Sequence, residues 1–372
     1  IAWPRVLPEG VGAVNEAGLA FYDRLIDALL AKGIQPWVTL FHWDLPLALY
    51  RRGGWGNREI VDWFTDYTAI VAKRLGDRVK HWMTFNEPQC FIGLGQLNGV
   101  HAPGDKLQIG ELTNMTHNVL LAHGSSVKAL RAGCRGPVMI GWAPVGKVNM
   151  PAEAGCEAAA MQAMAEVKAG SLWSNTWWSD PVYLGRYPDG ILEAYGHDAP
   201  RIRPGDMDLI HQPLDFCGIN IYNGNPVRPG PEGKPIEDKH AQGCPMTSFY
   251  WPVTPSALYW GPKFLYERYR LPVVITENGL ANPDWVALDG AVHDPQRIDF
   301  TARYLRELRR AADDGVQVGG YFHWSFMDNF EWAEGYKHRF GLIHVDYATQ
   351  KRTPKDSYHW YREVIRANGA NL

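Results

Sequence analysis

Two glutamates stand at the ends of apolar runs, and they are the side chains best suited to acid–base or nucleophilic chemistry. Glu87 follows the run over residues 79–85, and Glu277 follows the run over residues 271–276. Near-continuous runs of β-branched and aromatic residues are typical of buried parallel strands. A carboxylate at the carboxyl end of such a strand lies where α/β barrels hold their catalytic groups. The two glutamates therefore predict a carboxylate pair facing one cleft.

A carboxylate pair of this kind suits the cleavage of a glycosidic bond. That reaction needs a proton donor to the leaving oxygen and a carboxylate at the anomeric carbon. Two carboxyls in different surroundings can diverge in pKa, so that one stays protonated and the other ionised. The alternative is that each glutamate caps a helix or pairs with an arginine. Asn86 and Asn278, one beside each glutamate, favour the catalytic interpretation because an amide can bind sugar hydroxyls; Asn278, before Gly279, also suits a turn.

Other polar and aromatic residues follow predicted strands. His42 and Trp43 follow residues 34–41, and His323 and Trp324 follow residues 316–322. The 16 tryptophans exceed what a short cleft needs, so we expect most of them in the core and some against sugar rings. A metal hydrolase is the alternative use of the histidines. We predict no metal, because the candidate ligands lack HExxH or related spacing: His42, His101, His117, His123 and His323.

Length and composition favour one barrel-sized catalytic domain over residues 1–372. The 372 residues are 46% hydrophobic, enough for a large core. The net charge of −3 gives no support for a nucleic-acid partner or an anionic membrane, and no apolar run is long enough to span a bilayer. Phosphate-binding glycine motifs and the GxSxG nucleophile motif are absent from the sequence.

Cysteine usage bears on the compartment. The chain has five cysteines, an odd number, and no pair has CxxC spacing. We interpret them as free thiols in a reducing compartment and expect a cytoplasmic protein. The chain begins at Ile1, inside what we interpret as a strand, so we expect the natural N-terminus and any targeting segment to precede it.

Predicted strands and helices alternate along the chain. Strands are expected at residues 1–3, 34–41, 79–85, 137–142, 214–219, 271–276 and 316–322, and helices at 15–33, 57–76, 112–132, 151–169, 255–269, 294–313 and 355–367. Residues 223–255 are expected to form a long loop. This alternation predicts an α/β fold, a (β/α)8 barrel that lacks its first βα unit and part of its second strand.

Eight motifs in order resemble glycoside hydrolase family 1, the β-glucosidase family. They are Trp3-Pro4-Arg5, His42-Trp43-Asp44-Leu45-Pro46, Gly53-Gly54-Trp55, Thr84-Phe85-Asn86-Glu87-Pro88, His101-Ala102-Pro103-Gly104, Asp215-Phe216-Cys217-Gly218-Ile219-Asn220, Ile275-Thr276-Glu277-Asn278-Gly279 and Asp328-Asn329-Phe330-Glu331-Trp332. The resemblance implies a (β/α)8 barrel and a retaining β-glycosidase without metal or cofactor, acting on small-molecule β-glucosides and related glycosides.

The same resemblance implies a role for each site residue. Glu87 would be the general acid/base and Glu277 the nucleophile. The implied substrate contacts are Asn86 at the 2-hydroxyl, His42 and Trp43 at the 3-hydroxyl, Glu331 and Trp332 at the 4- and 6-hydroxyls, Trp324 as the apolar floor, Tyr222 on the nucleophile with Asn220 shaping the same corner, and Phe340 near the 6-position. Glu331 would repel a sugar phosphate, which favours neutral sugars.

The sequence departs from the family at two places. Gln89 stands where many bacterial relatives have an aromatic residue, and the family's first-strand Gln and second-strand Arg are not in the chain. The second hypothesis is therefore a truncated, inactive barrel that binds sugar weakly or serves as an assembly unit. Its open strand edges would be covered in a homo-oligomer.

Overall fold

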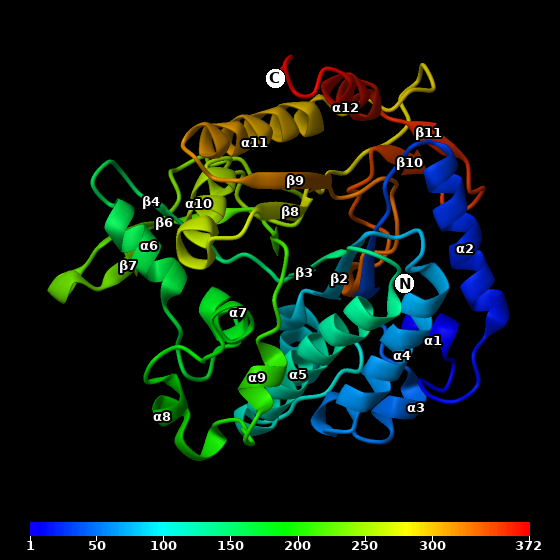
Figure 1. Ribbon diagram of the computed structural model, residues 1–372. Helices are drawn as coiled ribbons and strands as arrows, with labels where there is room; N and C mark the ends of the chain where they lie inside the picture. Colours follow the sequence, from blue (N-terminus) through cyan, green and yellow to red (C-terminus); the bar gives the residue numbers. More distant parts are fainter. The chain divides into compact units, whose positions relative to one another are not determined.

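The computed structural model describes residues 1–372 and divides into two compact units. Unit one contains Ile1–Val145 and Ala165–Gly218, and unit two contains Gly146–Met164 and Ile219–Leu372. Figure 1 shows their elements along the chain. No helix combines the length and the apolar character needed to cross a membrane.

Unit one is built on a parallel three-stranded sheet in the order β1-β2-β3. Its strands are β1 (Trp37–Phe41), β2 (His81–Asn86) and β3 (Met139–Ala143). The main helices are α2 (Glu16–Ala31), α4 (Ile60–Leu75), α5 (Ile109–Gly133) and α7 (Asn175–Leu184), with the shorter α1 (Trp3–Val6), α3 (Leu47–Tyr50), η1 (Gly54–Gly56), α8 (Ile191–Tyr195), η3 (Gly196–Asp198) and α9 (Asp206–Ile210). A π-helical segment, η2 (Cys90–Leu97), follows β2.

Apolar faces of the helices form the core of unit one. In α2, Asn15 caps the helix by accepting a hydrogen bond from the backbone N–H of Gly18, as its position predicts. Helices α4 and α5 pack against each other (Figure 1). Trp3 stacks on Tyr67 with ring centroids 5.4 Å apart, and it packs edge-on against Phe41, the last residue of β1, at 6.5 Å.

Unit two contains a second parallel sheet, in the order β5-β8-β9. Strand β5 (Cys217–Asn220) begins at the end of unit one, and β8 (Val273–Asn278) and β9 (Val318–His323) follow. The helices are α6 (Glu157–Ala165), which ends one residue beyond unit two, α10 (Ala257–Tyr269), α11 (Pro295–Asp313) and α12 (Asp356–Arg366). Helix α11 packs against both α10 and α12 (Figure 1). Short elements complete the unit: η4 (Pro231–Gly233), η5 (Trp332–Glu334), β10 (Ile343–Val345) and β11 (Arg352–Pro354).

A small sheet in unit two corrects two predictions. Strands β4 (Val148–Pro151), β6 (Gly224–Pro229) and β7 (Pro235–Glu237) pair in the order β4-β6-β7. Residues 223–255 are therefore not one unbroken loop. Pro151 ends an edge strand, opposite Val227, and does not open a helix; the helix begins six residues later, at Glu157.

The other differences have local causes. The strand expected at residues 1–3 is not formed: residues 1 and 2 belong to no helix or strand, and Trp3 begins α1. Pro4 occupies a position in the first turn of α1 that needs no N–H. The helix predicted at residues 57–76 begins later than expected, because the side chain of Asn57 accepts a hydrogen bond from the N–H of Glu59 and α4 begins at Ile60. Helix α7 was not predicted, because Pro181 lies inside it.

Candidate active site

Both glutamates lie at the carboxyl ends of parallel strands whose pairing is irregular. In unit one, the register of β2 against β3 shifts between Met83 and Asn86. In unit two, the register of β8 against β9 shifts between Ile275 and Asn278. Such irregularities re-aim side chains and are common beside active sites. The apolar run before each glutamate forms a strand, as predicted: Glu87 directly follows β2, whereas Glu277 is the last residue but one of β8. Both glutamates are nearly buried, at 9% exposure.

In unit one, three predicted site residues lie together at the ends of β1 and β2. The side-chain amide of Asn86 lies 3.2 Å from Nε2 of His42. The indole N–H of Trp43 donates a 3.0 Å hydrogen bond to the backbone carbonyl of Asn86. The two residues after β1 therefore fix both the side chain and the backbone of the residue that precedes Glu87.

His42 must be neutral to accept a hydrogen bond from the Asn86 amide. Burial lowers the pKa of His42 to about 3, so the imidazole is neutral at pH 7. A neutral imidazole has one acceptor nitrogen and one donor. With Nε2 as the acceptor for the Asn86 amide, the proton of the neutral ring lies on Nδ1.

The backbone is strained at residues that the sequence assigns to the site. Trp43 has a φ of 82° and Glu87 a φ of 45°, both in unit one. Non-glycine residues rarely adopt this left-handed region, and where they do they cluster at functional sites. Trp332 in unit two shares the feature, with a φ of 45°. The strain supports a functional interpretation of all three positions.

In unit two, Tyr222 lies against Glu277. The phenol donates a 2.7 Å hydrogen bond to Oε2 of Glu277. Tyr222 is itself fixed, because its carbonyl accepts a 2.9 Å hydrogen bond from the hydroxyl of Tyr304. Asn220, two residues before it, accepts a hydrogen bond from the hydroxyl of Thr276 at 2.5 Å. The predicted corner of Asn220, Tyr222 and Glu277 is therefore assembled within one unit.

Asn278 has a structural role. Its side chain is fully buried, donates to the carbonyl of Ile221 at 2.8 Å, and accepts from the hydroxyl of Tyr321 at 2.9 Å. These bonds join β8 to its two neighbouring strands. Asn278 was expected to suit a local turn. Its hydrogen-bond partners instead lie on neighbouring segments, at Ile221 and Tyr321.

Gly279 allows the chain after β9 to approach β8. A Cβ atom at Gly279 would overlap the carbonyl of Trp324, so no larger residue fits. The N–H of Trp324 donates a 2.8 Å hydrogen bond to the carbonyl of Asn278. Trp324, the predicted apolar floor, is thus placed directly beside the strand that carries Glu277.

Glu331 and Trp332 lie on the segment after β9 and are both partly exposed. The N–H of Glu331 donates to the carbonyl of Gly335 at 2.7 Å, which closes the short turn around η5. Phe340, by contrast, is buried and packs edge-on against Tyr222 with ring centroids 6.1 Å apart. Glu331, Trp332 and Phe340 therefore all lie on the segment that follows β9 in unit two.

Sequence reasoning missed the other aromatic rings around Tyr222. Trp251 lies 5.1 Å from Tyr222, and Phe249 lies 4.8 Å from Trp251 and 5.6 Å from Phe340, measured between ring centroids. Both belong to the stretch predicted as a loop. Three aromatic residues in succession at Phe249, Tyr250 and Trp251 are the signal that would have marked it as more than a connection.

A buried network of charges supports the segments after β8 and β9. Lys355 bonds to Asp284 at 2.5 Å and to Asp328 at 2.9 Å, and all three side chains are fully buried. Arg297 bonds to Asp284 at 2.7 Å and also pairs with Asp294. Buried charges require such partners. The network fixes backbone on both sides of Phe340, because Arg297 donates to the carbonyl of residue 339 and Asp328 accepts from the N–H of residue 341.

The remaining candidate histidines have packing roles or neighbours in their own unit. His117 bonds to Tyr187 and Asp206, and His123 to Thr84. The rings of His101 and Trp43 lie 5.3 Å apart. For His323, burial lowers the pKa to about 3, and the neighbouring cations Arg297 and Lys355 act in the same direction. No group of three His, Cys, Asp or Glu side chains has a metal-binding arrangement.

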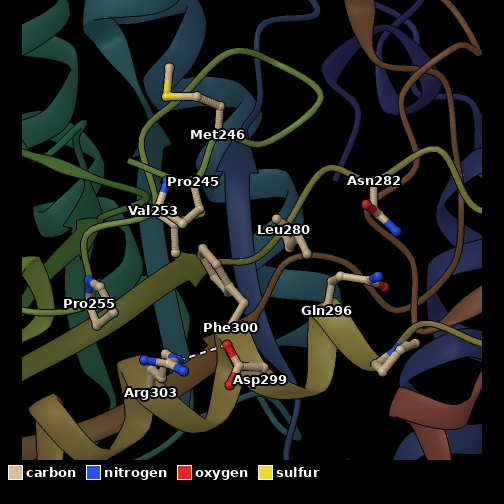
Figure 2. Close-up of a pocket in the computed structure, with 11 residues that line it drawn as sticks. Pro245, Met246, Val253, Pro255, Leu280, Asn282, Gln296, Asp299, Phe300 and Arg303 are labelled. Carbon is tan, nitrogen blue, oxygen red and sulfur yellow. Dashed lines mark hydrogen bonds and ion pairs between the residues drawn. The ribbon is translucent and has the colours of Figure 1, made fainter. Parts of the chain in front are cut away.

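A pocket of about 620 Å³ lies elsewhere in unit two (Figure 2). Proline, leucine and phenylalanine side chains form much of its wall, and its one lining carboxylate, Asp299, is ion-paired with Arg303 at 2.7 Å. None of the predicted site residues lines it. The pocket lacks a second carboxyl group, so it is unsuited to the two-carboxylate chemistry of a glycosidase.

Comparison with known proteins identifies the class. The profile of glycosyl hydrolase family 1 matches residues 1–370. Beta-glucosidase A of Thermotoga maritima is 42% identical over 99% of this chain and 82% of its own length. A bifunctional beta-D-glucosidase/beta-D-fucosidase of Bifidobacterium breve is 41% identical over 100% of this chain and 83% of its own. The structure of the T. maritima β-glucosidase in complex with deoxynojirimycin superposes with a TM-score of 0.89, at 43% identity, over 99% of this chain and 82% of that one.

The chain is an α/β-barrel hydrolase that acts on glycosides. It belongs to glycosyl hydrolase family 1. The predicted family and the predicted fold class, a (β/α)8 barrel, are both confirmed.

Proposed function

We propose that this glycosyl hydrolase is a retaining β-glucosidase, with Glu87 as general acid/base and Glu277 as nucleophile. Each glutamate is nearly buried and lies at the carboxyl end of a parallel strand, beside an irregularity in the strand pairing. The observation that carries the assignment is the 2.7 Å hydrogen bond from Tyr222 to Glu277, because a donor at this distance holds and stabilises an ionised carboxylate. The substrate is a small-molecule β-glycoside, and residues 1–372 act as one catalytic domain.

The reaction proceeds by two displacements. In the first, the Glu277 carboxylate attacks the anomeric carbon while Glu87 gives its proton to the glycosidic oxygen, and the aglycone leaves. In the second, the Glu87 carboxylate takes a proton from water, whose oxygen attacks the anomeric carbon and releases Glu277. Two inversions give a product with the original β configuration.

Substrate contacts follow the two groups of residues described above. Asn86, fixed by His42 and Trp43, binds the 2-hydroxyl, and His42 and Trp43 themselves contact the 3-hydroxyl side of the sugar. Glu331 and Trp332 bind the 4- and 6-hydroxyls. Trp324 supports the apolar face of the ring, Phe340 closes the 6-position, and Asn220 and Tyr222 shape the corner around the nucleophile.

Neutral monosaccharide units are the proposed specificity. Glu331 is a carboxylate and would repel a phosphate at the 6-position. A glucoside is favoured, and a fucoside, which lacks the 6-hydroxyl, is a second candidate in view of the bifunctional relative.

A panel of aryl β-glycosides tests the function, with product stereochemistry followed by NMR. We expect turnover of the β-glucoside with β-glucose as the first product. Glu277→Gly should be inactive, and azide should restore turnover with the inverted azide. Glu87→Ala should lose activity on poor leaving groups, and azide should give the retained azide. An α-anomer from the unchanged enzyme would contradict the retaining mechanism.

Two further expectations concern the surroundings of the enzyme. The five cysteines are free, which favours a reducing compartment, and we propose a cytoplasmic location. The proposed homo-oligomer is tested by light scattering, and a monodisperse monomer with full activity would contradict it.

A further inference from the structure

The turn that carries Glu87 has a conformation that the residue itself does not favour. Glu87 has a φ of 45°, in the left-handed region that L-residues rarely adopt. Such a conformation persists only where the surrounding contacts determine it. The contacts that hold this turn therefore decide where the Glu87 carboxyl lies.

Gln89 provides two of these contacts. Its side-chain amide donates a 3.2 Å hydrogen bond to the carbonyl of Val145 and accepts a 3.1 Å hydrogen bond from the N–H of the same residue. The side chain is 1% exposed, so water does not compete for these bonds. The N–H of Glu87 also donates a 2.8 Å hydrogen bond to the carbonyl of Ala143, the last residue of β3. Three hydrogen bonds therefore tie the turn to the end of β3 and to Val145 just after it.

Cys90 contacts the carboxyl group directly. Its thiol donates to Oε2 of Glu87 at 3.1 Å, and its backbone N–H donates to the Glu87 carbonyl at 2.9 Å. The residue opens the π-helical segment η2, a rare form that recurs at functional sites. A thiol is a weak donor. It can orient one carboxyl oxygen without holding that group permanently in its ionised state.

We propose that Gln89 and Cys90 are positioning residues for the general acid/base. Gln89 fixes the backbone of the Glu87 turn, and Cys90 fixes the rotation of its carboxyl group. This inference rests on the proposed role of Glu87 as proton donor. Proton transfer requires the donor oxygen within about 2.6–3.2 Å of the glycosidic oxygen, so a displaced carboxyl loses this function first.

Leaving-group dependence separates positioning from general structural damage. The leaving group of a 2,4-dinitrophenyl β-glucoside departs without protonation, whereas the leaving group of a phenyl or alkyl β-glucoside needs a proton from the general acid. The value of kcat/KM reports the first displacement, in which the proton is given. A variant that only misplaces Glu87 should therefore be impaired on the poor leaving group and nearly normal on the good one.

The experiment measures kcat/KM for both kinds of substrate in Gln89→Leu, Cys90→Ala, Cys90→Ser and Glu87→Ala. We expect Gln89→Leu to lose about 10- to 100-fold on the phenyl glucoside and under about 3-fold on the dinitrophenyl glucoside. Cys90→Ala should show a smaller loss of the same kind. Cys90→Ser keeps a donor at this place and should restore the activity on the phenyl glucoside.

Each outcome has a definite meaning. Equal losses on both substrates in Gln89→Leu and Cys90→Ala, or no loss in either, would overturn the positioning roles while Glu87→Ala still shows strong leaving-group dependence. If Glu87→Ala itself shows no such dependence, the acid assignment fails and the positioning roles fail with it. Should Gln89→Leu not fold, as judged by circular dichroism, the comparison of Cys90→Ala with Cys90→Ser decides the question.

Discussion

Oε2 of Glu277 accepts a hydrogen bond from the hydroxyl of Tyr222, which lies 2.7 Å away. The tyrosine cannot turn freely, because Tyr304 bonds to its backbone and the ring of Phe340 packs edge-on against it. A fixed donor to one carboxyl oxygen restrains the rotation of the Glu277 carboxyl group. This relationship gives the proposed nucleophile a defined orientation before the sugar binds.

Removal of this donor should slow both displacements. We expect Tyr222→Phe to lower kcat/KM on an aryl β-glucoside by about 10- to 100-fold, since a hydrogen bond to a charged group contributes about 1.5 to 3 kcal/mol. The loss should also appear with a 2,4-dinitrophenyl leaving group, because attack by Glu277 is needed for every substrate. Unchanged kinetics in steady-state assays would show that Tyr222 does not act on the nucleophile.

Glu331 should determine recognition of the 4- and 6-hydroxyls of the sugar. Glu331→Gln is expected to lower the ratio of kcat/KM for a β-glucoside to that for a β-xyloside, which lacks the 6-hydroxymethyl group, by about 10-fold. Glu232→Gln is the control, because Glu232 lies in η4 with 80% of its side chain exposed. An unaltered ratio in Glu331→Gln would remove this residue from the proposed subsite.

Lys355 should be critical for stability. Its ammonium group is fully buried between Asp284 and Asp328, so Lys355→Met would leave carboxylates without this partner in the interior. Breaking a buried ion pair typically costs about 3–5 kcal/mol, and we expect a loss of that order in the free energy of unfolding measured with urea. Lys168→Met, at an exposed pair with Glu166, should change it by at most about 1 kcal/mol. Similar losses in both variants would contradict the special role of the buried network.

A surface histidine should contribute a pH-dependent part of the stability. Hydrogen bonds to Asp289 and Asp356 raise the pKa of His293 from 6.5 to about 9. A raised pKa means that the folded state holds the proton more tightly, so the contribution is full below pH 6.5 and is lost as the pH rises through about 9. Between pH 6 and pH 9.5, the melting temperature of His293→Gln should therefore fall less than that of the unchanged protein. Equal decreases at low ionic strength would refute the contribution of these pairs.

Strand ends and their chemistry were predictable from the sequence, whereas contacts between distant segments were not. The apolar runs before Glu87 and Glu277 and the cap at Asn15 are local signals, and the structure confirms them. Pro151 misled the prediction because its pairing with β6 is a tertiary contact that overrides a helix-start preference.

The contacts around the glutamates show the same limit. The sequence alone does not reveal that the side-chain amide of Gln89 pairs with the backbone of Val145. Likewise, Cys90 was interpreted with the other cysteines only as a thiol outside any disulfide, and its bond to Glu87 depends on how the chain turns after β2. Trp251 escaped notice because its partner Tyr222 is distant in the chain.

Trapping the covalent intermediate tests the assignment of Glu277 as nucleophile most directly. A 2-deoxy-2-fluoro-β-D-glucoside with a dinitrophenyl leaving group should glycosylate the enzyme quickly and release it slowly, because the fluorine destabilises the oxocarbenium-like transition state. Peptide mass mapping of the trapped enzyme should place the sugar on Glu277, and Glu277→Gly should give no adduct. A sugar attached to another residue, or the absence of any adduct in the unchanged protein, would contradict the assignment of Glu277 as the nucleophile.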